Sequence, residues 1–264
     1  MITLLSLLAL GAVAGILAGL LGVGGGTIIV PVLIWIFHGY PEIPTANVMH
    51  VALATSLATI VITSLSSITA HQKQGAIDWP VVWRLTPGII VGALAGSVSA
   101  SFLSSDSLKI VFALFLLAIS AQLGFGAQPP PQRHLPQRLG MGLVGVIIGK
   151  LSALVGIGGG SLTVPFLVWC NIPMRNAVAT SAACGFPIAV ASTLGYIVSG
   201  WQMNLAWSSG FIYWPAVLAI VPTSLLFAPV GAKLAHTVTV GWLKGFFALF
   251  LAVVGIYMLA SIYV

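Results

Sequence analysis

The stretch GLLGVGGGTIIVPVL at Gly19–Leu33 recurs in similar form as ALVGIGGGSLTVPFL at Ala153–Leu167. In each copy a run of glycines separates two apolar segments, and a hydroxyl residue and a proline follow the glycines at the same spacing. Glycine disfavours the helix interior and permits backbone angles that other residues avoid. Each copy therefore predicts a break between two helical segments, and the pair of copies indicates an internal duplication.

This duplication extends over nearly the whole chain. Ala-Thr-Ser at 54–56 recurs at 179–181, and LKIVFALFLL at Leu108–Leu117 recurs as LKGFFALFLA at Leu243–Ala252. Between the halves lies QPPPQRHLPQ, whose three consecutive prolines predict a stiff, exposed connection. We therefore divide the chain into a first membrane repeat, a Pro-rich cytoplasmic linker and a second membrane repeat, at residues 1–127, 128–137 and 138–264.

The composition places the chain in a lipid bilayer. Of its 264 residues, 59% are hydrophobic and only 5% are charged, whereas a soluble domain carries about 25% charged residues. The apolar runs are of helical length, which excludes a membrane β-barrel. The bases are scattered singly, which argues against nucleic acid as a partner. The two cysteines form no framework for a disulfide or a metal, and no cofactor is expected.

Eight apolar blocks follow from this pattern, four in each half. They cover residues 2–38, 45–70, 79–103 and 107–125, and then 139–170, 176–199, 208–235 and 240–263. The first block of each half is longer than the roughly 20 residues that one crossing needs. Each of these two blocks also contains a glycine break, so it either crosses once as an interrupted helix or enters and returns as a hairpin.

The positive charges favour the hairpin, because cytoplasmic connections gather Lys and Arg. If the broken blocks cross once, the charges are divided equally between the two sides. If they are re-entrant hairpins, Lys109 lies alone on the outer side, opposite Lys73, Arg84, Arg133, Arg138, Arg175, Lys233 and Lys244. We therefore expect an all-α polytopic protein of two inverted repeats. Each repeat is a glycine-broken re-entrant helical hairpin followed by three transmembrane helices, and both chain termini lie outside.

The two glycine breaks are the first candidate for a binding site. Successive N–H groups at the positive end of a half-helix bind anions. Thr27 and Ser161 add a hydroxyl where a helix cap would lie. The candidate substrate-binding residues are Gly24, Gly25, Gly26 and Thr27 together with Gly158, Gly159, Gly160 and Ser161. The alternative is that the glycines only allow close helix packing.

Two further groups of residues are candidates for the same site. Thr55, Ser56, Thr180 and Ser181 could line a cavity from the next span of each half, although small residues also serve helix packing. Lys150 is the only cation deep in an apolar block, and its counterpart in the first half is Ile16. A lysine at that depth usually faces a polar pathway, unless its side chain reaches back to the membrane surface.

The paired GVGGGTIIVP and GIGGGSLTVP segments, with a Thr-Ser step in the next span, resemble the TauE/SafE sulfite exporter family, also called the toluene-sulfonate uptake permeases. The resemblance covers essentially the full length. It implies a secondary transporter in the cell inner membrane that exports small sulfur-containing anions such as sulfite or organosulfonates.

Other readings of the sequence remain open. The cargo could be another small anion, a carboxylate or a phosphonate, or the chain could be a non-transporting membrane subunit. An enzyme would need a nucleophile with a base or a metal site, and a cation carrier would need acids inside the membrane. Neither pattern is present, so no catalytic residue and no metal ligand is assigned. A homo-oligomer is neither indicated nor excluded.

Overall fold

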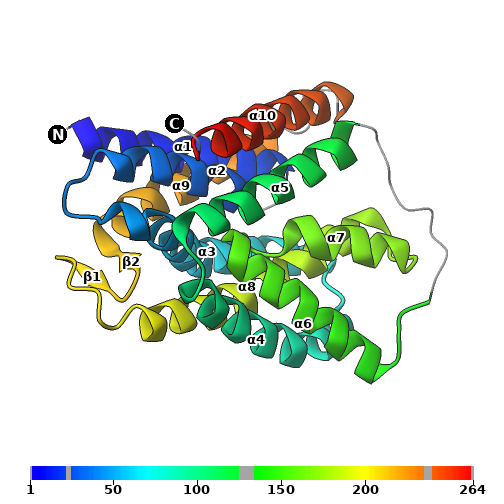
Figure 1. Cartoon of the computed structure of the whole chain (residues 1–264). Coiled ribbons are helices and arrows are strands. Elements are labelled where there is room, and N and C mark those ends of the chain that lie inside the picture. The colour runs from blue at the N-terminus through cyan, green and yellow to red at the C-terminus, as the bar shows by residue number, and fades with distance from the viewer. Residues whose placement is uncertain (1, 22–24, 125–133, 235–239, 263–264) are drawn as a thin grey trace.

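The computed structural model describes residues 2–21, 25–124, 134–234 and 240–262, and these residues are mostly helical (Figure 1). The helices of the first half are α1 (Ile2–Leu21), α2 (Gly26–His38), a short 3₁₀ turn (Thr45–Asn47), α3 (Val48–Lys73), α4 (Trp79–Ser101) and α5 (Ser105–Gly124). Those of the second half are α6 (Arg138–Val155), α7 (Gly160–Trp169), α8 (Met174–Ser199), α9 (Trp214–Leu234) and α10 (Val240–Ala260). Both predicted helix breaks are confirmed, since a helix ends before each glycine run and another begins within it.

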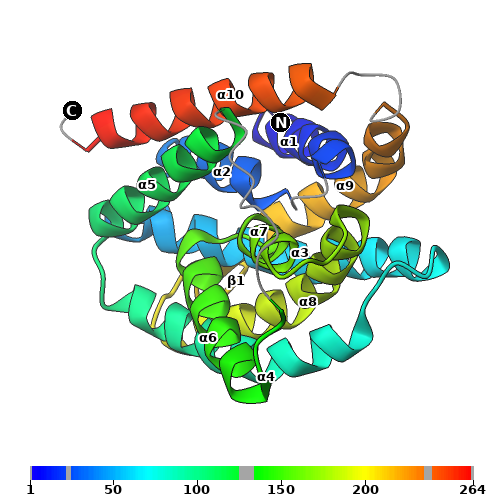
Figure 2. The same cartoon turned by 90° about the vertical axis from the view of Figure 1, so that its right-hand side faces the viewer.

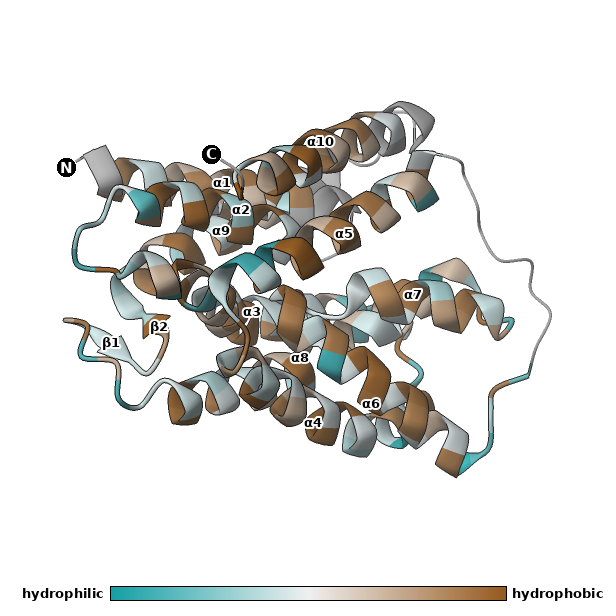
Figure 3. Cartoon of the chain, viewed as in Figure 1, coloured by the Kyte–Doolittle hydropathy of each residue, from teal (hydrophilic) through white to brown (hydrophobic). Residues whose placement is uncertain are grey.

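Five of the described helices are long and apolar enough to cross a membrane, namely α3, α4, α5, α6 and α8. Large apolar side chains also cover the outside of the protein, for example Phe102 and Leu139, which are 83% and 87% exposed. Figure 3 shows apolar residues along most of the length of the helices. The chain is therefore a multi-pass membrane protein.

One predicted boundary is wrong. The apolar block at 208–235 begins with a two-stranded hairpin, β1 (Ser208–Ser209) and β2 (Ile212–Tyr213), and its helix starts only at Trp214. Ser208 pairs with Tyr213, and Ser209 pairs with Ile212. Gly210, in the turn, has a φ of 59°, a left-handed conformation that glycine adopts without strain. The hydropathy of this segment resembles that of a helix, but the glycine turn forms a hairpin, and the helix therefore begins later, at Trp214.

The first helix of each half packs along a helix of the other half. α1 lies against α9, and α6 lies against α4 (Figures 1 and 2). Both contacts use glycines, since a Cβ on Gly11 would come within 2.5 Å of the Ile220 carbonyl oxygen, and one on Gly145 within 2.5 Å of the Leu85 carbonyl oxygen. Without side chains between them the backbones approach closely, as is typical of helix pairs in membranes.

The core divides into two clusters with α3 and α8 packed together near the centre (Figure 2). One cluster is formed mainly by α1, α2, α3, α5, α9 and α10, and the other by α4, α6, α7 and α8. Both termini lie at the same side of the protein in Figure 1, where α2 also returns to connect to α3, and α5 leaves toward α6 at the opposite side.

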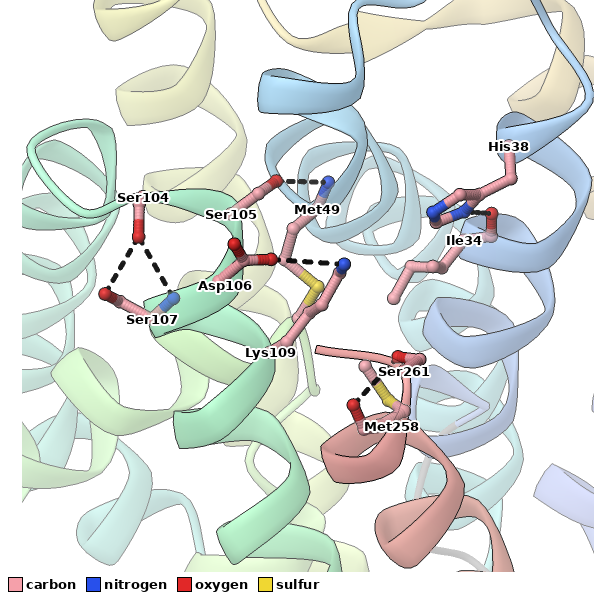
Figure 4. Close-up of polar contacts among 10 residues, drawn as sticks. All are labelled: Ile34, His38, Met49, Ser104, Ser105, Asp106, Ser107, Lys109, Met258 and Ser261. Carbon is pink, nitrogen blue, oxygen red and sulfur yellow. Dashed lines mark hydrogen bonds and ion pairs between the residues drawn. The ribbon is translucent and has the colours of Figure 1, made fainter. Parts of the chain in front are cut away.

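The one cation predicted on the side of the termini is an ion-paired residue. Lys109, in the first turns of α5, places its Nζ 3.3 Å from the Asp106 carboxylate, and its side chain is only 11% exposed (Figure 4). On the neighbouring helix end, His38 Nδ1 lies 2.7 Å from the Ile34 carbonyl oxygen. Because Asp106 compensates its charge, Lys109 contributes little to a charge difference between the two sides.

Two equivalent hydrogen bonds join the halves. The Tyr213 backbone N–H donates to Thr55 Oγ1 at 3.1 Å, and the Asp78 backbone N–H donates to Thr180 Oγ1 at 3.0 Å. Tyr213 directly precedes α9, which packs on α1, and Asp78 directly precedes α4, which packs on α6. The donors belong to a further repeat that the sequence analysis missed, GAIDWP at 75–80 and GFIYWP at 210–215, in which both glycines have positive φ.

Aromatic packing supports one of these bonds. The Tyr213 ring makes edge contacts with Phe37 and Tyr40, with ring centroids 5.8 and 6.1 Å apart. Burial raises the pKa of the Tyr213 phenol, and the nearby Tyr40 phenol and Glu42 carboxylate raise it further. The phenol therefore stays neutral at physiological pH, and the ring contacts pack β2 against the end of α2.

We expect Thr55→Val and Thr180→Val to destabilise the protein by about 1–3 kcal/mol each, since each leaves a backbone N–H without its acceptor. The effect should be larger for Thr55→Val, because the Tyr213 N–H is buried and the Asp78 N–H only partly so. Thermal unfolding in detergent measures this. Thr59→Val is the control, since the Thr59 hydroxyl only bonds the Thr55 carbonyl of its own helix. An unfolding temperature equal to that of the control would show that these bonds contribute nothing.

We also expect the residue after α2 and the residue before α6 to lie on opposite sides of the membrane. Single cysteines at Gly39 and Gln137, both exposed, would be placed in a background in which the buried Cys170 and Cys184 are replaced by alanine. A membrane-impermeant thiol reagent should label position 39 in intact cells and position 137 only after permeabilisation. Labelling of both positions in intact cells would rule out the hairpin topology.

Candidate functional site

The two glycine breaks lie against each other. A Cβ on Gly26, the first residue of α2, would come within 2.5 Å of the Gly156 carbonyl oxygen and within 3.1 Å of Ile157 Cα. Ser56, from α3, donates its hydroxyl hydrogen to the same Gly156 oxygen at 3.0 Å. A break from one half therefore meets the break from the other half, and α3 holds the junction.

The second break adopts a backbone that needs glycine at two positions. Gly156, which caps α6, has a φ of 71°, and Gly159, which precedes α7, has a φ of 79°. A Cβ on Gly156 would also come within 2.8 Å of a Leu53 methyl carbon, and one on Gly159 would clash with Ile188. Left-handed angles and tight packing together explain the glycine run at this break. At the first break, Gly24 lies outside the described residues.

Each short helix presents free N–H groups at the junction. In α2 the first backbone bonds run from Ile28 and Ile29 to the Gly25 carbonyl, so the N–H groups of Gly26 and Thr27 precede the first helical bond. In α7 the corresponding bonds run from Leu162 and Thr163 to Gly159, which leaves the N–H groups of Gly160 and Ser161. Such groups form the positive end of the helix dipole and attract anions.

The lengths of the two short helices fit the hairpin topology. α2 has 13 residues and α7 has 10. At a rise of 1.5 Å per residue they extend for about 20 Å and about 15 Å, against a hydrocarbon core about 30 Å thick. For hairpins that enter from opposite surfaces, we therefore expect both breaks near the middle of the bilayer, where irregular backbone is stable only if protein or a cavity covers it.

The predicted capping role of Thr27 and Ser161 is wrong. The N-cap positions are occupied by Gly25 and Gly159, and no side chain caps either helix. Thr27 and Ser161 are instead the second residues of α2 and α7, inside the first turn rather than at the N-cap. Both side chains are buried, and neither hydroxyl has a hydrogen-bonding partner in the protein.

Unpartnered hydroxyls occur at the breaks and along α8. Among the described residues, nine buried side-chain polar atoms lack a partner; four belong to Thr27, Ser152, Ser161 and Thr163 at the breaks, and four to Ser181, Ser192, Thr193 and Ser199 of α8. Elsewhere in the membrane helices, hydroxyls such as those of Thr86 and Ser97 bond a carbonyl one turn back in their own helix. Because buried polar groups are nearly always paired, the hydroxyls at the breaks are suited to a ligand.

The other predicted residues divide into three groups. Thr55 and Thr180 accept backbone N–H groups of the other half, and Ser56 bonds the second break. Ser181 is buried without a partner. Lys150 has an exposed side chain on α6, whereas Gly156–Ser161 are buried, so the structure does not bring Lys150 together with the breaks. That its charge attracts the anion stays a prediction.

Two hydroxyl residues of this region, Ser152 and Thr163, were missed by the sequence analysis. They lie four residues before Gly156 and four residues after Gly159, which is one helical turn on either side of the second break. Their counterparts in the first half, Ala18 and Ile29, are apolar, so the repeated pattern of hydroxyl residues does not include them. Within the described part of the chain, no three His, Cys, Asp or Glu side chains are grouped closely enough to hold a metal ion.

The chain is similar in sequence to known membrane transporters over nearly its whole length. The family model for the sulfite exporter TauE/SafE matches residues 7–258. A probable membrane transporter protein of Haemophilus influenzae is 37% identical over 95% of this chain and 96% of its own length. One from Methanocaldococcus jannaschii is 29% identical over 96% of this chain and 94% of its own, and one from Bacillus subtilis is 27% identical over 86% and 87%.

No solved structure matches the chain. The family model, however, covers nearly its whole length, including both glycine breaks and the helices that hold them. The relative from Haemophilus influenzae is likewise similar from end to end. This chain therefore belongs to the TauE/SafE sulfite exporter family of membrane transporters.

Proposed function

We propose that this membrane transporter carries small sulfur-containing anions, such as sulfite or organosulfonates, across the cell inner membrane, and that it exports them. One observation carries the proposal: the N-terminus of α2 packs on the second glycine break, and Thr27 and Ser161, in the first turns of α2 and α7, each have a buried and unpartnered hydroxyl. The name of the matching family, a sulfite exporter, supports the substrate class and the direction.

The anion would bind between Gly24, Gly25, Gly26 and Thr27 on one side and Gly158, Gly159, Gly160 and Ser161 on the other, with Ser181 nearby. Backbone N–H groups and hydroxyls donate to the oxyanion, and no salt bridge is needed. Thr55, Ser56 and Thr180 would hold the site together through their bonds between the halves, and Lys150 would attract the anion from a distance. A site without a fixed cation binds moderately and releases readily, which suits a carrier.

The two halves would work as inverted repeats, each a re-entrant hairpin followed by three transmembrane helices. Support comes from the equivalent pairings of α1 with α9 and of α6 with α4, and from the equivalent hydrogen bonds of Thr55 and Thr180. Such repeats place a substrate site at their interface, and rocking of one part against the other exposes that site to each side in turn.

Two other functions are compatible with this site. The cargo could be a carboxylate or a phosphonate, because N–H groups and hydroxyls also bind these oxyanions. The chain could also be a membrane subunit that transports nothing. Counterflow in liposomes separates the cases: labelled sulfite, sulfoacetate, a phosphonate and a carboxylate are each offered to liposomes loaded with the same unlabelled anion. Uptake of the sulfur anions alone supports the proposal, and uptake of none of the four rejects it.

The site itself is tested by Thr27→Ala and Ser161→Ala. Each should weaken sulfoacetate binding by about 1 kcal/mol, the net contribution of one hydrogen bond, with little change in unfolding temperature without ligand. The measurement is stabilisation of the purified protein by the anion in a thermal shift assay. Thr59→Val is the matched control, since its hydroxyl is also buried but bonds its own helix. If sulfoacetate stabilised both alanine variants as much as the control, the site would lie elsewhere.

A further inference from the structure

A row of hydroxyl side chains runs along one face of α8. Ser181, Ser192 and Ser199 share this face with Ile188, because the spacings of seven, four and seven residues are each close to whole helical turns. The Oγ atoms of the three serines are buried and have no partner in the protein. Serines inside membrane helices usually bond a carbonyl one turn back, so three free hydroxyls on one face call for another partner. We call these three serines the α8 row.

The beginning of the α8 row lies against the second glycine break. A Cβ on Gly185, one turn after Ser181, would come within 2.7 Å of the Gly158 carbonyl oxygen. One turn further on, Ile188 Cδ1 is the atom nearest to a Cβ built on Gly159. The row therefore starts beside the break at which α7 presents its N–H groups.

The end of the α8 row reaches the surface on the side of the chain termini (Figure 1). Ser199, the last residue of α8, lines a groove of about 440 Å³ between the ends of α4 and α8. Ser101, the last residue of α4, and Gln202 add polar groups to the same groove. The surface end of the row is thus open and polar, although it lies between two membrane helices.

The middle of the α8 row is closed in this structure. Ser192 is 0% exposed. Between Ser192 and Ser199, a Cβ on Gly195 would clash with Oγ of Ser97, so α4 and α8 are in direct contact there. Passage from the second break to the groove therefore requires α4 and α8 to separate at Gly195.

The first half carries polar residues at the equivalent positions of α3, namely Ser56, Thr63, Ser67 and Gln74, with the same spacings. α3 begins on the side of the termini and α8 ends there, so the two rows lead toward opposite sides (Figure 1). Ser67 is half-buried and Gln74 is exposed, whereas their counterpart Ser192 is fully buried. One row open and the other closed is the arrangement that alternating access requires.

We propose that the α8 row is the route by which the anion passes between the second break and the groove, and that Ser192 donates a hydrogen bond to the anion on the way. This inference rests on the proposed function and adds a route to it. An oxyanion that leaves water for the interior of a membrane loses its hydration, which is costly unless other donors replace the water. Ser192 and Ser199, about 10 Å apart along the helix, supply such donors.

The first test compares Ser192→Ala with Thr193→Val. Alanine is as small as serine, so a role in helix packing alone predicts no effect of Ser192→Ala. Thr193 is the matched control, since its hydroxyl is also buried and unpartnered but lies about 100° away around α8. Ser192→Ala should slow sulfoacetate counterflow in liposomes about fivefold, the loss of one net hydrogen bond during passage, and should leave the Kd for sulfoacetate within about twofold.

Thr193→Val should change neither the rate nor the Kd. The unfolding temperature of Ser192→Ala without ligand should not fall, because the substitution removes a buried hydroxyl that has no partner. A slower rate in this variant therefore reports passage of the anion rather than misfolding.

The second test probes the route with a reagent of the same chemical class as the cargo. Single cysteines replace Ser192 or Thr193 in a background in which Cys170 and Cys184 are alanine. The anionic reagent 2-sulfonatoethyl methanethiosulfonate, added from the side of the termini, forms a disulfide with an accessible thiol and releases methanesulfinate. It should block transport by Ser192→Cys and spare Thr193→Cys, and sulfoacetate should slow the block.

The outcomes separate the route from the function on which it rests. If wild-type protein transports none of the anions offered in counterflow, both are overturned. If wild-type protein transports sulfoacetate and Ser192→Ala does so equally fast, the function stands and the route is overturned. Equal block of both cysteine variants by the reagent overturns the route as well. A loss of sulfoacetate affinity as large as the loss of rate in Ser192→Ala would assign Ser192 to the site at the breaks instead.

Discussion

The rest of the structure depends on one constraint: a helix that is interrupted inside a bilayer exposes backbone groups that lipid cannot satisfy. This chain interrupts two helices and brings the interruptions together, so that each covers the other. Gly26 packs on the Gly156 carbonyl, and Ser56 donates a hydrogen bond to that carbonyl. The carbonyl at the second break is thereby satisfied by protein, while the N–H groups at the start of α2 and α7 are left for a ligand.

Close packing between the halves makes this junction stable. Glycines on α1 and α6 let these helices contact the backbones of α9 and α4, so the first helix of each half is held by the other half. The hydroxyl residues then have different functions according to their position. Thr55 and Thr180 hold the halves together through backbone N–H groups, whereas Thr27, Ser161, Ser152 and Thr163 keep their hydroxyls free at the breaks.

Repetition made much of this arrangement predictable from the sequence. Both helix breaks, the family and the hydroxyls of Thr27 and Ser161 followed from segments that occur twice. The sequence could not show that Gly25 and Gly159 occupy the N-caps, because the hydroxyl residues Thr27 and Ser161 lie only two positions further on and sequence does not define the start of a helix that closely. It also could not show that Lys150 faces outward, since exposure depends on the packing of α6 against α4. Ser152 and Thr163 could not be predicted from the repeat because their counterparts in the first half, Ala18 and Ile29, carry no hydroxyl.

The central claim, that the two breaks form one anion site, is tested most directly by anomalous X-ray diffraction from crystals grown with selenite, a heavier analogue of sulfite. The anomalous signal reports the position of selenium without any assumption about the protein. The account predicts one peak between the start of α2, at Gly26 and Thr27, and the start of α7, at Gly160 and Ser161. A peak elsewhere, for example beside the exposed Lys150 or in the groove lined by Phe102 and Trp201, with none at the breaks, would contradict it.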